Sequence, residues 1–290
     1  MKTKSRIWLG VGAFVMVGTG ATAPVGPLVA ATISGLRAQV SPGADAERAI
    51  VVAQHADHGK EPAKEAGEGG EGKAIANLPL ELAFAVRIAL LRGHLLIGDE
   101  LVQQRQWNAA LPHFLHPTEE LYGDIKDQLA DYKVPPFDGA LNALAKVVKA
   151  KKGGDDYSKA LKPVMDALDA ADAAMKAKQA DWPGFVVETA VETLKTAANE
   201  YKEAIVGGRI AKPVEYQDAR GFIRQADRMI LGISTELQKK DPAAFNEVRS
   251  GLLELQKAFP SAMPPKSPVK DHAAVLGEIS RIELAAGKLM

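Results

Sequence analysis

The chain has no cysteine among its 290 residues, only 6% aromatic residues, and no net charge, with 36 basic and 36 acidic side chains. Without thiols it can form neither disulfides nor thiolate metal sites, so we expect no disulfide partner. Without a basic excess to displace counterions from phosphates, we also expect no nucleic-acid partner. Any metal site must therefore use His, Asp, Glu, Tyr or backbone oxygen ligands, which suit iron, zinc, manganese or calcium.

Several catalytic signatures are also missing. The sequence contains no Gly-rich phosphate loop, no GxSxG elbow and no HExxH pair. Alternation of β-branched residues, which would indicate strands, appears nowhere at length. Nucleophilic catalysis has no obvious candidate residue, and the sequence favours a binding role over an enzymatic one.

Residues 1–36 have the pattern of an export signal. Three basic residues precede an apolar core at 7–18, and small residues at 29–31 offer a cleavage site. The uncharged run is also about long enough to span a bilayer as an uncleaved anchor. Pro24 and Pro27 weaken a continuous spanning helix, so we favour a cleaved signal and a periplasmic destination.

Residues 37–76 are predicted to be a flexible linker. Gly, Ala, Glu and Lys dominate this segment, and large apolar residues are nearly absent after Val52. Such a composition cannot bury a core. His55 and His58 lie within it as HADHG, which indicates either weak metal capture or simply two solvated side chains.

From residue 77 onward the apolar residues recur with helical period, so we predict an all-α fold. Asp181-Trp-Pro-Gly is typical of a boundary, dividing the chain into two tandem four-helix-bundle-like units at 77–180 and 181–290. An offset of about 104 residues aligns Val102-x-x-Arg105 with Val206-x-x-Arg209, which suggests an internal duplication. The expected helices span about 77–104, 108–132, 138–151, 156–178, 184–206, 213–239, 242–259 and 269–288.

His94 is the first candidate metal ligand. On a helical wheel it falls among apolar residues and away from the charged stripe. A buried imidazole needs a hydrogen-bond partner or a metal. His94 is therefore either a core histidine bonded to a carboxylate from a neighbouring helix or a metal ligand.

The stretch HFLHPTEE supplies four further candidates: His113, His116, Glu119 and Glu120. If one helix runs through it, His113, His116 and Glu120 share a face and could ligate a cation. Pro117 instead favours a new helix beginning there, with both glutamates in its acidic first turn. The two histidines would then be ordinary exposed side chains.

Two carboxylates in the second half form another candidate site. Glu215 and Glu283, together with His272, lie on otherwise apolar helix faces, which is costly unless they pair or bind something. The alternative is a structural network in which Glu283 pairs with His272 or Arg220. Positions equivalent to His113 and His116 hold Gln217 and Arg220, so a histidine site is expected only in the first half.

Two blocks, AANEYKEAIVGGRIAKPVEYQDARGF and SAMPPKSPVKDHAAVLGEISRIELAA, resemble helical periplasmic proteins of bacterial iron uptake. These are the imelysin-like proteins and the extracytoplasmic segments associated with iron permeases. The resemblance implies a helical-bundle architecture from about Leu78 onward, and a GxHxxE motif linked in imelysin-like proteins to metal or peptidase activity. Here the glycine directly precedes His94, and Ile97 stands where that motif has its glutamate.

We therefore predict a periplasmic protein that captures a metal ion, with iron expected and zinc as the alternative, and delivers it to a membrane transporter or permease. The predicted ligands are His94, His113, His116, Glu119 and Glu120, with Glu215 and Glu283 as a second site. The rival hypotheses are an imelysin-type metallopeptidase or hydrolase, which needs an open metal position and a carboxylate base, and an adaptor module without metal.

Overall fold

The computed structural model describes residues 75–290. The predicted signal at 1–36 and nearly all of the predicted linker at 37–76, including His55 and His58, lie outside the described residues. The described residues, 75–290, belong to one compact unit. The division of the helical region at residue 180, and the internal duplication, remain predictions.

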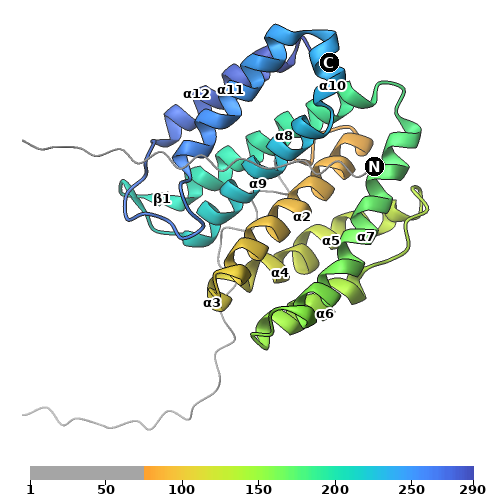
Figure 1. The fold of residues 1–290 in the computed structure, drawn as a ribbon, viewed down its shortest axis with the longest axis vertical. Helices are drawn as coiled ribbons and strands as arrows, with labels where there is room; N and C mark the ends of the chain where they lie inside the picture. Colours follow the sequence, from red (N-terminus) through yellow and green to blue (C-terminus); the bar gives the residue numbers. More distant parts are fainter. Residues whose placement is uncertain (1–74) are drawn as a thin grey trace, which may run out of the picture. The chain divides into compact units, whose positions relative to one another are not determined.

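The described residues are almost entirely helical, which confirms the all-α prediction (Figure 1). A two-residue antiparallel pair, β1 (Ile205–Val206) with β2 (Arg209–Ile210), is the exception within residues 75–290, and it closes through Gly207 and Gly208 at positive φ. None of the described helices combines the length and the apolar character needed to cross a bilayer. The helices are α2 (Leu80–Gln103), α3 (Trp107–Ala110), α4 (Pro112–His116), α5 (Tyr122–Leu129), α6 (Asp138–Lys149), α7 (Asp155–Lys178), α8 (Trp182–Ala204), α9 (Pro213–Gly232), α10 (Ser234–Lys240), α11 (Pro242–Ala258) and α12 (His272–Ala286), with a π-helical turn, η1 (Pro117–Leu121), after α4.

Helices α8, α9, α11 and α12 form a four-helix bundle, in which α8 packs on α9, α11 on α12, and each pair on the other. Proline in the first turn and a capping aspartate mark the start of two of them. Asp181 accepts a hydrogen bond from Gly184 N, and Asp241 accepts from the amides of Ala243 and Ala244. These signals explain why the sequence predicts the starts of α8 and α11 to within two residues.

Helix α2 packs against α8 and α9 on one side and contacts α4, α5 and α7 on the other (Figure 1). Most of its side chains are buried, from Leu82 to Val102, so it is apolar on nearly all sides. A helix that is hydrophobic all round lies in the interior of a protein. Helix α2 therefore joins the bundle to the α4–α7 segment, and residues on it can meet partners from both.

The predicted helical stretch at 108–132, with interruptions expected at Pro112 and Pro117, is divided into α3, α4, η1 and α5. Pro112 begins α4, and Pro117 begins the π turn, in which Tyr122 N donates to Pro117 O. The chain therefore stays helical past Pro117 with one wide turn rather than starting a separate helix. The predicted helix at 213–239 is likewise interrupted at Ile233, between α9 and α10.

Candidate metal centre

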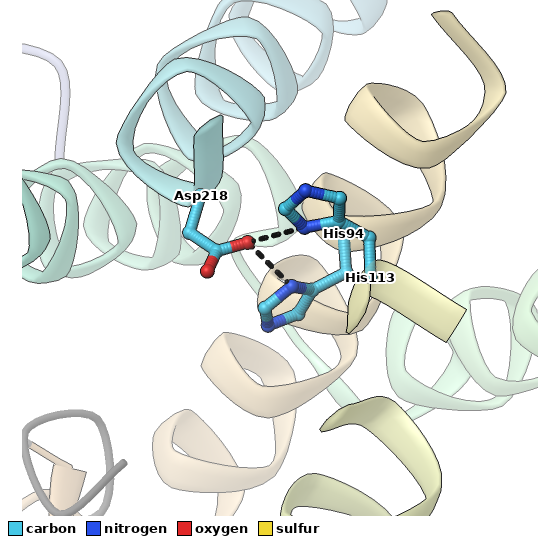
Figure 2. Close-up of side chains that lie close together, drawn as sticks. All are labelled: His94, His113 and Asp218. Atoms are coloured by element: carbon cyan, nitrogen blue, oxygen red, sulfur yellow. Dashed lines mark hydrogen bonds and ion pairs between the residues drawn. The ribbon is translucent and has the colours of Figure 1, made fainter. Parts of the chain in front are cut away.

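Three side chains from three helices converge at the centre of the described unit (Figure 2). His94 comes from α2, His113 from α4 and Asp218 from α9. Nδ1 of His94 and Nδ1 of His113 each lie 2.8 Å from the same oxygen, Oδ1 of Asp218. One carboxylate oxygen is thus shared by two imidazoles. We call these three residues the histidine–aspartate cluster.

The histidine–aspartate cluster is enclosed. His94 and His113 are 0% exposed and Asp218 is 3% exposed. Burial alone would raise the pKa of Asp218, but the charge of both imidazoles and their hydrogen bonds hold that pKa far below its usual range. Asp218 is therefore a carboxylate, and the two rings supply the compensating charge or hydrogen bonds that a buried anion requires.

A fourth residue, Gln217, determines which nitrogen of His113 carries a proton. Its Nε2 donates to the backbone oxygen of Ala262 at 3.2 Å, so its Oε1 faces Nε2 of His113 at 3.0 Å. Because Oε1 can only accept, Nε2 of His113 must be the donor. Neutral His113 then has its lone pair on Nδ1, pointing at the carboxylate of Asp218.

Two acceptors facing each other at 2.8 Å require a positive charge between them or on one of them. Either His113 is an imidazolium that donates to Asp218, or a cation lies between Nδ1 and Oδ1. A second-shell hydrogen bond that fixes the tautomer is also how proteins orient a metal-binding histidine. Gln217 therefore prepares Nδ1 of His113 for either state.

Glycines allow the three helices to approach closely enough to form the cluster. A Cβ added to Gly221 on α9 would lie 2.4 Å from the backbone oxygen of Gly93 on α2. Gly93 directly precedes His94, and Gly221 lies about one turn after Asp218. A Cβ on Gly98 would lie 2.7 Å from the ring of Phe114, so Gly98 likewise allows α4 to approach α2 closely. Small residues at helix crossings thus set the position of the site.

Within residues 75–290, His94, His113 and Asp218 form the one group of three or more potential ligands whose donor atoms lie within 4.8 Å of one another. Two ligands of one ion, each about 2.1 Å from it, are at most about 4.2 Å apart. A small inward movement would therefore suffice for coordination. Two imidazoles and one carboxylate form the donor set typical of Fe(II) sites that keep open positions.

The other predicted ligands of the first half lie nearer the surface. The ring of His116 meets that of His94 edge-on, with centroids 5.9 Å apart, and is partly exposed. Glu119 is exposed, whereas Glu120 is partly buried. The continuing helix places the rings of His113 and His116 6.1 Å and 5.9 Å from that of His94.

The second predicted site is not assembled. Glu215 is buried, and its Oε1 lies 3.5 Å from Nζ of Lys212. Burial raises its pKa, although Lys212 opposes the shift. Glu283 is half-exposed and pairs with Lys195 at 2.7 Å, whereas the predicted network placed it with His272 or Arg220. Each carboxylate therefore has a lysine partner, and neither belongs to the three-ligand group among the described residues.

Sequence reasoning missed Asp218 and Gln217. The prediction limited histidine ligands to the first half, and both cluster histidines come from there, but the carboxylate comes from the second half. The interpretation of His94 as a core histidine called for a carboxylate from a neighbouring helix, but did not identify it. The adjacent Gly221, at which another helix can approach, was the available signal.

Glu100, six residues after His94, is occupied elsewhere. Its two oxygens lie 2.9 and 3.1 Å from Nη2 of Arg220, and Arg224 donates to it as well. Its oxygens are therefore engaged by guanidinium groups of α9. It therefore does not replace the glutamate of the GxHxxE motif as a catalytic base.

Comparison with known proteins gives one match. Residues 176–290 match the family model of the iron permease-associated 4-helix bundle domain. No curated protein and no solved structure matches the chain. The matched stretch is less than half of the chain, and it includes Asp218 but neither His94 nor His113. It supports a helical protein associated with an iron permease, and it bears on neither the imelysin-like resemblance nor the metal ligands.

Proposed function

We propose that this protein is a periplasmic component of iron uptake that binds a transition-metal cation, expected to be iron, at His94, His113 and Asp218. The observation that carries the proposal is the geometry at His113. Oε1 of Gln217 accepts a hydrogen bond from Nε2 of His113, so the lone pair on Nδ1 of neutral His113 points at a carboxylate 2.8 Å away. A cation between them removes the conflict between two acceptors.

The chemistry of the three ligands supports the same function. Imidazole and carboxylate ligands together suit Fe(II) and Zn(II), whereas calcium and magnesium prefer sites made entirely of oxygen. Full burial of His94 and His113 excludes water from the ligands, which strengthens their interaction with an ion. The cation is cargo and not a resident cofactor, since delivery to a permease requires that it leave again.

The partly exposed His116 offers a path by which the bound ion can leave the site. Its ring lies against that of His94, with centroids 5.9 Å apart, and it belongs to the segment that contains the π turn. In this proposal His116 lies between the buried ligands and the surface, and provides an intermediate ligand for an ion that enters or leaves. The match of residues 176–290 to a permease-associated domain supports a membrane permease as the receiving partner.

Calorimetric titration of the full chain with Fe(II) under anaerobic conditions, and separately with Zn(II), tests the proposal. We expect one ion per chain and proton release on binding, because histidine ligands give up any proton on the coordinating nitrogen. His94→Asn and Asp218→Asn should each weaken binding about 100-fold or more, as expected when a metal ligand is disturbed. All proteins should carry His55→Ala and His58→Ala, which remove the second histidine pair of the chain.

The matched control is Glu100→Gln, which changes a partly buried carboxylate on the same pair of helices without touching the cluster. It should bind metal as the parent does. Absence of stoichiometric metal, or equal affinity in the parent and Asp218→Asn, would show that the cluster is an internal hydrogen-bond network only.

A further inference from the structure

A second site lies between α2 and α9, where its lining on α9 begins at Gln225, two helical turns after Asp218. A cavity of about 200 Å³ opens between α2, α7, α8 and α9, and a neighbouring cavity of about 150 Å³ extends it past α7. The two share Arg92, Gln225 and Arg228. We call the two cavities together the α2–α9 cleft.

One end of the α2–α9 cleft is apolar. The larger cavity is lined by the aromatic rings of Trp182 and Phe185 and by the side chains of Met175 and Met229. The rings of Trp182 and Phe185 lie 6.0 Å apart at an angle of 31°. Flat aromatic walls and flexible methionines are the lining that suits a planar apolar body.

Hydrogen-bond donors gather where the two cavities meet. Gln225 is 7% exposed and lines both cavities. Nε of Arg92 is buried and has no hydrogen-bond acceptor among residues 75–290. A buried donor without an acceptor is costly, and a ligand oxygen could satisfy it.

The third residue, Arg228, is exposed and forms no salt bridge with any described residue. Burial lowers its pKa, as do the nearby charges of Arg224 and Arg92, while Asp99 only partly offsets them. Arg92 itself is neutralised by Asp169 and Asp172, each 2.7 Å away. The surroundings of Arg228 therefore disfavour its positive charge, and an added anion would relieve that cost.

We propose that the α2–α9 cleft binds a small organic anion with a planar apolar body, such as an aromatic carboxylate or sulfonate. The apolar body lies between Trp182, Phe185 and the methionines. The anionic group accepts hydrogen bonds from Arg228, Gln225 and Nε of Arg92. The proposal does not depend on metal binding at the cluster.

Fluorescence titration of the full chain with two probes tests it. The anion is 1-anilinonaphthalene-8-sulfonate, and N-phenyl-1-naphthylamine is the same body without the charge. We expect saturable binding of one anion per chain. Arg228→Gln should weaken binding of the anion about fivefold to tenfold, which corresponds to about 1 to 1.4 kcal/mol. Its affinity for the uncharged probe should stay within about twofold of that of the parent. Gln225→Leu should weaken binding of the anion and leave binding of the uncharged probe unchanged.

The matched control is Arg209→Gln, which removes a positive charge from the exposed first residue of β2. It should bind both probes as the parent does. Asp218→Asn should also bind the anion normally, which separates this test from that of the metal site. Equal effects of Arg228→Gln on both probes, no effect on either, or no saturable binding of the anion would overturn the proposal.

Discussion

Helices α2 and α9 hold two carboxylates in opposite ways. At the histidine–aspartate cluster the carboxylate is Asp218 on α9, and its partners are His94 on α2 and His113 on α4. One and a half turns farther along α2, the carboxylate is Glu100, and its partners are Arg220 and Arg224 on α9. Both pairs link the same two helices, but the bases differ.

The difference lies in whether the partner can give up its proton. A guanidinium stays protonated at every accessible pH, so the Glu100 pair is a permanent salt bridge with no room for a cation. An imidazole titrates near neutral pH and exposes a lone pair once it loses its proton. The Asp218 arrangement can therefore exchange protons for a metal ion, and the Glu100 arrangement cannot.

The largest expected effect comes from the glycine crossing that supports both pairs. Gly221→Ala places a methyl group 2.4 Å from the backbone oxygen of Gly93, so α2 and α9 must separate. Overpacking of this kind costs about 3 kcal/mol of unfolding free energy. Urea unfolding measures the loss, and metal titration should show weaker binding, because His94 and Asp218 move apart.

Gly277→Ala on α12 is the matched control, because nothing lies within 4 Å of the added Cβ. Replacing glycine by alanine inside an open helix position should stabilise the protein by about 0.4 to 1 kcal/mol. If Gly221→Ala were as well tolerated as Gly277→Ala, the close crossing of α2 and α9 would not be what positions the cluster.

The next prediction distinguishes the two carboxylates by how much a bound metal ion stabilises the folded protein. A metal that binds only the folded state stabilises it by about 2.7 kcal/mol at a concentration 100 times Kd. Urea unfolding with Zn(II), compared with unfolding in chelator, should show this gain in the parent and in Glu100→Gln. Asp218→Asn should show almost none. Glu100→Gln should itself lose about 1 to 2 kcal/mol without metal, because two partly buried guanidinium groups lose their acceptor.

A reversed pattern, in which Zn(II) stabilises Asp218→Asn but not Glu100→Gln, would place the metal at the other carboxylate. Equal stabilisation of both would place it outside the α2–α9 contact.

The fold could be predicted from the sequence because its signals are local. Asp181, Asp241 and the prolines that follow them mark helix starts, and apolar periodicity marks the faces. The break at Ile233 and the π turn at Pro117 carry no comparable signal, because each depends on how the segment packs against the rest of the chain. Such tertiary effects override local preference.

The site could be predicted only in part, for a related reason. A helical wheel shows that His94 is turned inward and that His113 and His116 lie on one face, but it cannot show which helix lies opposite. Asp218 lies more than a hundred residues from His113 in sequence, and the aligned positions suggested Gln217 and Arg220 instead. Glu215 attracted attention because an acid on an apolar face is unusual, yet its neighbour Lys212 already provides a partner.

Glu215 on α9 provides the smallest test, because it is a third buried or partly buried carboxylate and its partner, Lys212, is a third kind of base. Burial raises its pKa in the folded state despite Lys212. The folded protein then holds a proton that the unfolded chain has already released, so stability falls as pH rises from the unfolded value, about 4.3, through the folded one. Glu215→Gln removes this contribution to the pH dependence of the unfolding free energy. The unfolding free energy of Glu215→Gln relative to the parent should therefore increase from pH 4 to pH 7, whereas a decrease would mean that the pair with Lys212 outweighs the cost of burial.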